Sequence, residues 1–396
     1  MPVGRRRVSL LCLLLNVLFC LLVAVTWNLR SDKSGRQKIL IPSQRFWRQL
    51  VPSKSFWNRE QQRLDLLSNP NVNSVLSAIE LPDWLNDTGP TDPCEPDYRV
   101  RRQILDYNVL PGRFQDFLLH MRCRTYPVLI DQPRVCEDTP FLLLVIKSLM
   151  PHFDRRQAIR ETWGRAGVFA NQTVATVFLL GSTLPSDHHP DLQGMLHHEG
   201  ALHKDIIQWD YRDSFFNLTV KEVLFLEWFS QNCSQAKFVF KGDDDVFVNT
   251  IRILEFLGNL SESRSKELFI GDVISNAGPH RNRKLKYFIP ESVFSGLYPP
   301  YAGGGGYLYS GDLALRLHSA SQQVVLYPID DVYTGMCLKK LGLGPERHQG
   351  FRTFGIDPKY RDNPCVYRVL MLVHSLTPQE MLRIWPWIIH PELDCQ

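Results

Sequence analysis

Three adjacent carboxylates, Asp243, Asp244 and Asp245, lie between two short apolar runs in the segment FVFKGDDDVFVN, residues 238–249. Runs rich in Val and Phe are typical of strands buried on both faces, so the triplet falls where a core strand ends or is interrupted. Crowded carboxylates repel one another, and a hard divalent cation with oxygen ligands compensates that repulsion. The alternative is a solvated acidic turn, because aspartate-rich turns are common. The triplet predicts a metal site that other residues must complete.

Two later segments could supply acceptor and catalytic groups. The segment YPPYAGGGGYLYSG, residues 298–311, surrounds four consecutive glycines with tyrosines. The glycines permit unusual dihedrals and close backbone approach, and the rings offer flat faces to sugars. The motif YPIDDVYTG places Asp330 and Asp331 after a short apolar run, where we expect an extended segment, and LMLVHS ends a buried strand at His374. A lone histidine is usually structural, so His374 becomes a ligand only if the fold brings it to the triplet.

Polar side chains also follow other predicted strands. RRQAIRETWG places Arg156 and Arg160 on one helix face, and their fork of donors suits a phosphate-bearing ligand. The alternative is a pair of surface arginines that contact Glu161 or solvent. DYRDSFFNLTVKEV offers Asp213 and Lys221, where the aspartate either accepts hydrogen bonds from a base or sugar or caps a helix.

The elements that must position these residues alternate along the chain. Strands are predicted in FLLLVIKSL (141–149), TVATVFLLG (173–181), KDIIQWDY (204–211) and KFVFKGDDDVFV (237–248). Helices are predicted in PHFDRRQAIRETWG (151–164), with its start signalled by Asp154 and Gln157, in VKEVLFLEWF (220–229), and around Phe114, Phe117, Leu118 and Met121. Alternating strands and helices indicate an α/β fold with a largely parallel sheet, whose ligands bind at the carboxyl ends of the strands.

The N-terminus predicts a membrane anchor. Residues 8–29 carry no charge, and they lie between Arg5-Arg6-Arg7 and Arg30. The stretch is long enough to span a bilayer, whereas the apolar core of the alternative, a cleaved signal peptide, is typically only about 7–15 residues. We favour an uncleaved signal anchor. The N-terminal arginines then stay in the cytosol, and the large C-terminal part is lumenal.

Cysteines and glycosylation sequons agree with the secretory route. Two of the nine cysteines lie in the anchor, and the other seven predict three disulfides and one free thiol whose pairing cannot be read from the sequence. No Cys-x-x-Cys pair is present, so zinc is not expected. Sequons occur at Asn86, Asn171, Asn217, Asn232 and Asn259.

The net charge of +4 hides an uneven distribution. Residues 30–63 hold nine Lys or Arg against two acidic residues, which is typical of a solvated or lipid-facing stem, and its pairs Phe46-Trp47 and Phe56-Trp57 are expected to dock on another surface. Residues 64–396 hold 33 Lys or Arg against 39 Asp or Glu. A net acidic folded part does not support nucleic-acid binding.

The motifs RRQAIRETWG, VFLLG, YRDSFFNLTVKEV, FVFKGDDDVFVN, YPPYAGGGGYLYSG and DDVYTG, in this order, resemble the β-1,3-glycosyltransferase family of Golgi type II membrane enzymes. The resemblance covers nearly the whole chain. It implies a GT-A nucleotide-sugar-binding fold, a UDP-N-acetylglucosamine (UDP-GlcNAc) donor and a divalent cation, Mn²⁺ or Mg²⁺. It also implies an inverting transfer onto galactose-terminated lactosamine glycans of glycoproteins or glycolipids, which extends poly-N-acetyllactosamine.

The resemblance also assigns roles by position. Asp245 matches the direct metal ligand, with Asp243 and His374 as its companions, and Asp331 matches the catalytic base. Residues expected near the donor are Arg156, Arg160, Asp213, Lys241 and Asp244. Residues expected near the acceptor are Tyr301, Gly304, Gly305 and Asp330.

The predicted organisation is a single-pass type II protein of the Golgi membrane. Its parts are a cytosolic tail (1–7), an anchor (8–29), a lumenal stem (30–93), an N-terminal helical subregion (94–140) and a catalytic domain (141–396). Two other functions stay open: a β-1,3-galactosyltransferase of the same family, since donor choice depends on pocket shape, and a non-catalytic lumenal glycan-binding relative. Intact Asp243, Asp245 and Asp331 argue against the second. Homo-oligomers, or hetero-oligomers with other glycosyltransferases, also stay open.

Overall fold

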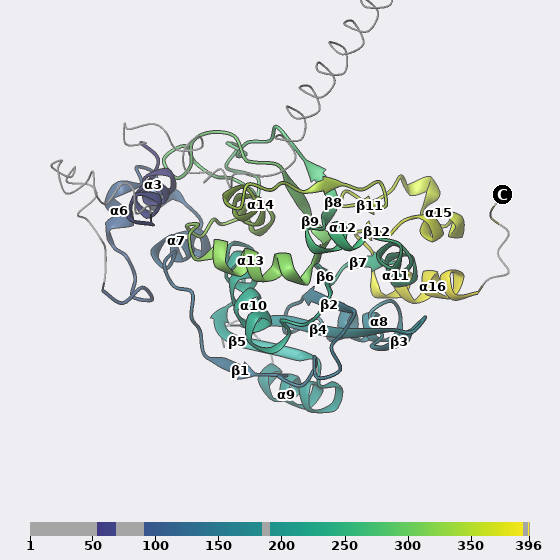
Figure 1. The fold of residues 1–396 in the computed structure, drawn as a ribbon. Helices are drawn as coiled ribbons and strands as arrows, with labels where there is room; N and C mark the ends of the chain where they lie inside the picture. Colours follow the sequence, from purple (N-terminus) through teal and green to yellow (C-terminus); the bar gives the residue numbers. More distant parts are fainter. Residues whose placement is uncertain (1–53, 69–90, 184–190, 391–394, 396) are drawn as a thin grey trace, which may run out of the picture.

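The computed structural model describes residues 54–68, 91–183, 191–390 and 395 (Figure 1). The predicted anchor, the Phe46-Trp47 pair and the sequon at Asn86 lie outside these ranges. Within them, no helix combines the length and the apolar character that a membrane crossing requires.

The main sheet of the described part has nine strands. They are β1 (Val128–Ile130), β2 (Leu142–Lys147), β3 (Gly167–Phe169), β4 (Gln172–Ser182), β5 (Ile206–Arg212), β6 (Phe238–Asp243), β8 (Phe269–Ile274), β9 (Tyr301–Ser310) and β10 (Glu346–Arg347). Their order is β1-β5-β4-β2-β6-β9-β8-β10, with β3 paired to β4. The central strands β5, β4, β2 and β6 are parallel, whereas β9 is antiparallel to both β6 and β8. The predicted α/β class and the mostly parallel central sheet are confirmed.

A smaller sheet begins immediately after the acidic triplet. It joins β11 (Phe351–Arg352), β12 (Leu372–His374) and β7 (Val246–Val248), and β12 runs antiparallel to β7 with His374 opposite Val246. The triplet therefore marks the point where the chain leaves the main sheet and enters the small one. This register brings the end of a distant strand beside the triplet.

Helices cover both faces of the main sheet (Figure 1). One face carries α3 (Phe56–Ser68), α6 (Arg99–Gln103), α7 (Gly112–Leu119), α10 (Leu218–Asn232), α13 (Gly311–Ser321) and α14 (Asp330–Lys340). The other carries α8 (Phe153–Glu161), α9 (Leu192–His203), α11 (Thr250–Gly258), α15 (Pro364–Val369) and α16 (Pro378–Ile389), and the short α12 (Glu262–Lys266) precedes β8. Alternate residues of β2 enter the two cores: Leu143 and Val145 face the first, and Leu144 and Ile146 face the second. A strand buried on both faces explains its continuous apolar run.

The glycine-rich segment, for which no element was predicted, forms strand β9, because its neighbours β6 and β8 supply hydrogen-bond partners on both sides. Three local expectations need correction. Asp330 and Asp331 begin helix α14 and are not on an extended segment. His152, not Asp154, is the N-cap of α8, and Met121 lies beyond the end of α7.

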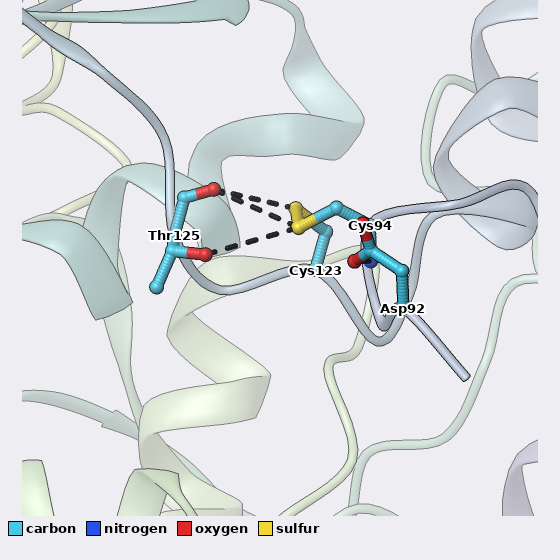
Figure 2. Close-up of a disulfide and its surroundings, with 4 residues drawn as sticks. All are labelled: Asp92, Cys94, Cys123 and Thr125. Carbon is cyan, nitrogen blue, oxygen red and sulfur yellow. Dashed lines mark hydrogen bonds between the residues drawn. A yellow bond between two sulfur atoms is a disulfide. The ribbon is translucent and has the colours of Figure 1, made fainter. Parts of the chain in front are cut away.

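The disulfide expectation is confirmed. Bridges join Cys94 to Cys123, Cys136 to Cys233 and Cys365 to Cys395, and Cys337 is a buried unbridged thiol. Figure 2 shows the first bridge, where the Asp92 carboxylate accepts a hydrogen bond from the Cys94 backbone N–H at 2.8 Å. The second bridge ties the segment before β2 to the end of α10, so the predicted helical subregion is covalently joined to the sheet domain.

The described sequons lie in two kinds of surroundings. Asn171, in the turn between β3 and β4, and Asn259, after α11, are exposed. The Asn217 and Asn232 side chains are partly buried at the two ends of α10, and they donate hydrogen bonds to the carbonyls of Arg212 and Trp228. Glycan occupancy at these sites stays a prediction.

Candidate active site

Asp243, Asp245 and His374 form a compact cluster of ligand-type atoms. Strand β6 ends at Asp243, the chain turns through the triplet, and β12 delivers His374. One ligand atom from each residue lies within 4.8 Å of the others. The structure thus meets the condition set from the sequence, that the fold must bring the histidine to the triplet.

The orientation of His374 fits a metal ligand. Its Nδ1 lies 2.9 Å from the Thr353 carbonyl, which can only accept, so Nδ1 carries a proton. The Nε2 atom then faces Oδ1 of Asp245 at 3.2 Å. When the ring is neutral, Nε2 of His374 and Oδ1 of Asp245 are both hydrogen-bond acceptors, so they repel each other unless a cation lies between them. A histidine that binds a metal through one nitrogen commonly donates a hydrogen bond to a carbonyl from the other, as Nδ1 does here.

The charges in the cluster are strongly coupled. Burial, and then the neighbouring carboxylates Asp330 and Asp245, raise the pKa of Asp243. The hydrogen bond with Asp245 raises the pKa of His374. Two partly buried carboxylates and an imidazole are a donor set that suits a hard divalent cation.

Lys147 joins this cluster to the predicted base region. It is the last residue of β2, directly beside Asp243 in the parallel register. Its buried Nζ lies 2.8 Å from Oδ1 of Asp243 and 2.8 Å from Oδ2 of Asp330. The two carboxylates raise the pKa of Lys147 against the opposing effect of burial, so the bridging charge is maintained. Asp330 is therefore a buried carboxylate in an ion pair with Lys147, whereas the sequence led us to expect it beside the acceptor.

Asp244 points away from the cluster, into the loop between β2 and α8. Its carboxylate accepts hydrogen bonds from Ser148 Oγ at 2.7 Å, His152 Nδ1 at 2.7 Å and Arg155 Nη1 at 2.8 Å. These bonds lower the pKa of Asp244 although burial opposes them. The middle carboxylate of the triplet thus anchors a neighbouring loop, and it has no open side for the direct donor contact expected of it.

Three groups in this region escaped the sequence reasoning. All three contact the acidic triplet: Lys147 contacts Asp243, and His152 contacts Asp244. Arg155 contacts Asp244 and also lies 3.7 Å from Asp245. A lysine at the end of an otherwise apolar strand was the available signal for Lys147. Arg155 lies in the first turn of α8 and His152 lies immediately before it, and no local sequence pattern reports that this helix start packs beside the triplet.

Asp331 lies in the first turn of α14, facing the middle of the glycine run. Its Oδ2 accepts a hydrogen bond from the Gly304 backbone N–H at 3.1 Å, and its Oδ1 accepts one from its neighbour Val332 at 2.7 Å. Burial, and then the charge of Asp330, raise the pKa of Asp331 to about 7. A carboxylate that gains and loses a proton near neutral pH suits a general base.

The glycines of β9 are explained by what lies on each side of the strand. A Cβ added to Gly304 would meet the Asp331 carboxylate at 3.4 Å, and one added to Gly305 would meet Thr353 at 2.9 Å and His374 at 3.4 Å. Strand β9 therefore passes between Asp331 and His374 with its backbone alone. The requirement at both positions is space and not an unusual dihedral.

Arg156 and Arg160 lie away from any open donor site. The guanidinium of Arg156 is fully buried, binds Glu199 through two nitrogens, and donates to the carbonyls of Leu149 and Met150. Arg160 binds Glu199 and Asp205 at 2.7 Å each. Their donors are used by protein groups, so the structure gives both residues a role in fixing α8 in place of the direct phosphate contact expected from their spacing.

Lys241 and Asp213 differ in their remaining capacity. Lys241 is fully buried in an ion pair with Glu222, and burial lowers its pKa, which leaves no direct contact with a donor. Asp213, just after β5, uses only Oδ2, which accepts from Lys221 Nζ at 2.8 Å and the Gly181 N–H at 2.9 Å. Its buried Oδ1 has no hydrogen-bond partner among the described residues. Buried acceptors are rarely left unpaired, so this atom has the capacity to accept a further hydrogen bond.

An α/β sheet that carries a two-aspartate and histidine cluster beside the Asp331 carboxylate fits a sugar-transferring enzyme, and comparison with known proteins identifies the family. The family model described as galactosyltransferase matches residues 154–349. The chain belongs to this family.

More narrowly, the chain is 57% identical to N-acetyllactosaminide beta-1,3-N-acetylglucosaminyltransferase 2 of Mus musculus and 55% identical to that of Homo sapiens, over 100% of this chain and of each relative. It is 43% identical to UDP-GlcNAc:betaGal beta-1,3-N-acetylglucosaminyltransferase 7 of Rattus norvegicus, over 77% of this chain and 78% of that protein. The family resemblance, and the resemblance of the whole chain to the first of these enzymes, were both predicted from the sequence and are confirmed.

Proposed function

We propose that this chain is an inverting glycosyltransferase. It transfers N-acetylglucosamine from UDP-GlcNAc in β-1,3 linkage onto the terminal galactose of N-acetyllactosamine chains and so extends poly-N-acetyllactosamine. The observation that carries the proposal is the pairing of the Asp243, Asp245 and His374 cluster with Asp331, linked through Lys147 and Asp330. The full-length identity to enzymes named for this transfer supports it.

Asp243, Asp245 and His374 would hold the divalent cation, which we propose to be Mn²⁺ with Mg²⁺ as the alternative. When bound, the cation stabilises the growing negative charge of the departing diphosphate. The chain's own residues prepare the site: Thr353 fixes the tautomer of His374, and Lys147 holds Asp243 at the end of β6. Asp213 offers its unpaired Oδ1 to an N–H or hydroxyl of the donor.

Asp331 acts on the acceptor. The galactose 3-hydroxyl is a weak nucleophile until a positioned base removes its proton, which accelerates such steps by about 10²–10⁴-fold. As Oδ2 of Asp331 takes the proton, the hydroxyl oxygen bonds to the anomeric carbon and UDP leaves from the opposite side. Displacement at one centre inverts the α-linked donor to a β product, by the geometric logic of inverting glycosidases. The half-buried Tyr301, at the start of β9, offers a ring face to the acceptor.

The proposal also includes a Golgi location. We propose that the chain is a single-pass type II protein anchored by residues 8–29, with its catalytic part in the lumen. The three disulfides agree with an oxidising compartment.

A direct test compares UDP-GlcNAc with UDP-galactose as donors to N-acetyllactosamine. Transfer from UDP-GlcNAc, with a β-1,3 product, is expected. Preferential transfer from UDP-galactose would favour the galactosyltransferase alternative, and binding of lactosamine without transfer from either donor would favour the glycan-binding one. For the metal, His374→Ala should abolish Mn²⁺-supported UDP binding measured by calorimetry. Unchanged affinity would remove the histidine from the metal site.

A further inference from the structure

Helix α3 lies in the predicted stem, yet it is docked on the sheet domain through specific contacts. The backbone N–H groups of Phe56 and Trp57 donate to the carbonyls of Ser292 and Val293 at 2.8 and 2.9 Å. The Asn58 side chain exchanges two hydrogen bonds with the Ser295 backbone. A spacer between anchor and enzyme needs none of these bonds, so α3 belongs structurally to the folded unit.

A second set of contacts holds the segment that leads into the base. Trp57 is 1% exposed, and its Nε1 donates to the carbonyls of both Val325 and Leu326 at 3.1 Å. One turn later, Gln61 donates to the Gln323 carbonyl at 3.0 Å and accepts from the Val325 N–H at 2.8 Å. The side chains of Trp57 and Gln61 thus bind four consecutive peptide groups of the backbone between Gln323 and Tyr327, shortly before α14.

Helix α3 also binds the far end of α14. Asp65 lies 2.5 Å from Nζ of Lys340, the last residue of α14, and this aspartate also accepts from Gln61. At its other end, α14 begins after Ile329, which provides no side-chain cap. The position of the first turn therefore depends on the ion pair of Asp330 with Lys147, on the hydrogen bond of Asp331 with Gly304 and on the segment that enters the helix. Helix α3 therefore holds the base-bearing helix at its C-terminal end and through the segment that enters it.

The ring of Trp57 also packs in an aromatic cluster that reaches the start of strand β9. It packs edge-on against Tyr327, with ring centroids 5.7 Å apart. The Tyr327 hydroxyl lies 2.8 Å from that of Tyr298, whose ring packs against Tyr301 at the start of β9. Strand β9 then supplies the Gly304 N–H that binds Asp331. Trp57 thus packs in an aromatic cluster that extends from the segment before α14 to the start of β9.

We propose that helix α3 is part of the catalytic unit and that Trp57 and Gln61 are positioning residues for Asp331. The inference rests on the proposed function of Asp331 as the base. Its physical reason is that displacement of a catalytic group by about 1 Å, even from a remote change, can cost about 10²-fold in rate. The proposed metal ligands Asp243 and His374 lie on β6 and β12, and none of these bonds joins α3 to either strand.

The test uses the full chain with single substitutions. Trp57→Phe keeps a packed ring but removes the N–H donor to Val325 and Leu326, and Gln61→Leu keeps the volume but removes both of its bonds to the segment. Asn58→Ala is the matched control, since it removes two hydrogen bonds of the same helix to a different loop. We expect Trp57→Phe and Gln61→Leu to lower kcat for transfer to N-acetyllactosamine about tenfold, with a displaced pH–rate midpoint. The KM for UDP-GlcNAc and the UDP affinity in Mn²⁺ should stay unchanged, and Asn58→Ala should keep kcat.

Two outcomes overturn the proposal. If both variants lower the melting temperature but keep the wild-type kcat and pH profile, α3 contributes stability alone. If Asn58→Ala loses as much kcat as they do, the docking of the helix matters and the segment before Asp331 does not. Should Trp57→Phe fail to fold, Gln61→Leu decides between the same outcomes. Measuring Asp331→Asn beside them separates the two proposals. High turnover of Asp331→Asn contradicts the assignment of the base. An inactive Asp331→Asn enzyme together with normal turnover of Trp57→Phe contradicts only the positioning role of α3.

Discussion

The pH dependence of transfer tests the assignment of Asp331 most directly. Burial and the neighbouring Asp330 charge raise the pKa of this carboxyl to about 7. A general base works only when ionised, so activity should be gained as the pH rises through this value and lost below it. With a pKa of about 7, roughly one tenth of Asp331 is ionised at pH 6 and roughly nine tenths at pH 8. The value of kcat/KM should therefore rise about tenfold between these two pH values.

Substitutions at the two adjacent carboxylates sharpen the test. Asp331→Asn keeps the shape of the side chain but cannot take the proton, so transfer should fall by at least about 10²-fold and lose its pH step, while UDP binding persists. Asp330→Asn removes a negative charge that raises the pKa of Asp331 and leaves Lys147 in place, so the midpoint should move to lower pH. Asp330→Asn should keep far more activity than Asp331→Asn, although it loses the ion pair with Lys147.

The assay is the initial rate of transfer from UDP-GlcNAc to N-acetyllactosamine across pH 6 to 8, together with calorimetric UDP affinity for each variant. A flat wild-type profile over this range would contradict the raised pKa of the base. An Asp331→Asn enzyme with near-normal turnover, beside an inactive Asp330→Asn enzyme, would show that the base has been assigned to the wrong carboxylate.

Three further predictions concern the framework. Arg156→Met leaves the buried Glu199 without the arginine that binds both of its oxygens and should lower the free energy of unfolding by about 3–5 kcal/mol. The control Arg252→Met, in an exposed pair with Glu255, should lower it by less than about 1 kcal/mol. Equal losses in a denaturant titration would contradict the structural role of Arg156. Replacing Cys136 and Cys233 by Ser opens a bridge between positions 97 residues apart and should cost about 2–5 kcal/mol by the same measurement, so an unchanged midpoint would be unexpected. A secreted form without residues 1–36 should be active, but one without residues 1–68 loses α3 and should show little secretion or little transfer; full activity of the shorter form would show that α3 is dispensable.

Local patterns were enough for much of the fold. The apolar runs at 141–149 and 173–181 correspond to β2 and β4, because a strand buried on both faces is largely apolar, and the mixed segment at 204–211 corresponds to β5. They failed where long-range pairing overrides local preference. The glycine run carries no local strand signal, yet hydrogen bonds with β6 and β8 make it a strand. The Asp330-Asp331 pair looks extended, yet it begins helix α14, where Lys147 from a distant strand contacts Asp330.

For the site, the sequence by itself determined which residue types are available: an acidic triplet at a strand end, a paired aspartate after an apolar run, and a histidine at the end of a strand. Residue type and spacing carry that information because metal binding and proton transfer require particular atoms. Only the tertiary structure decided which of them meet. The antiparallel register of β12 on β7 brings His374 to Asp245, Lys147 joins Asp243 to Asp330, and Asp244, Arg156 and Lys241 are taken up by interior partners. Spacing along the chain cannot report the distance between atoms that strand pairing brings together across more than a hundred residues. For this reason, only the folded structure distinguishes the carboxylates and cations of the candidate site from those that bind interior partners.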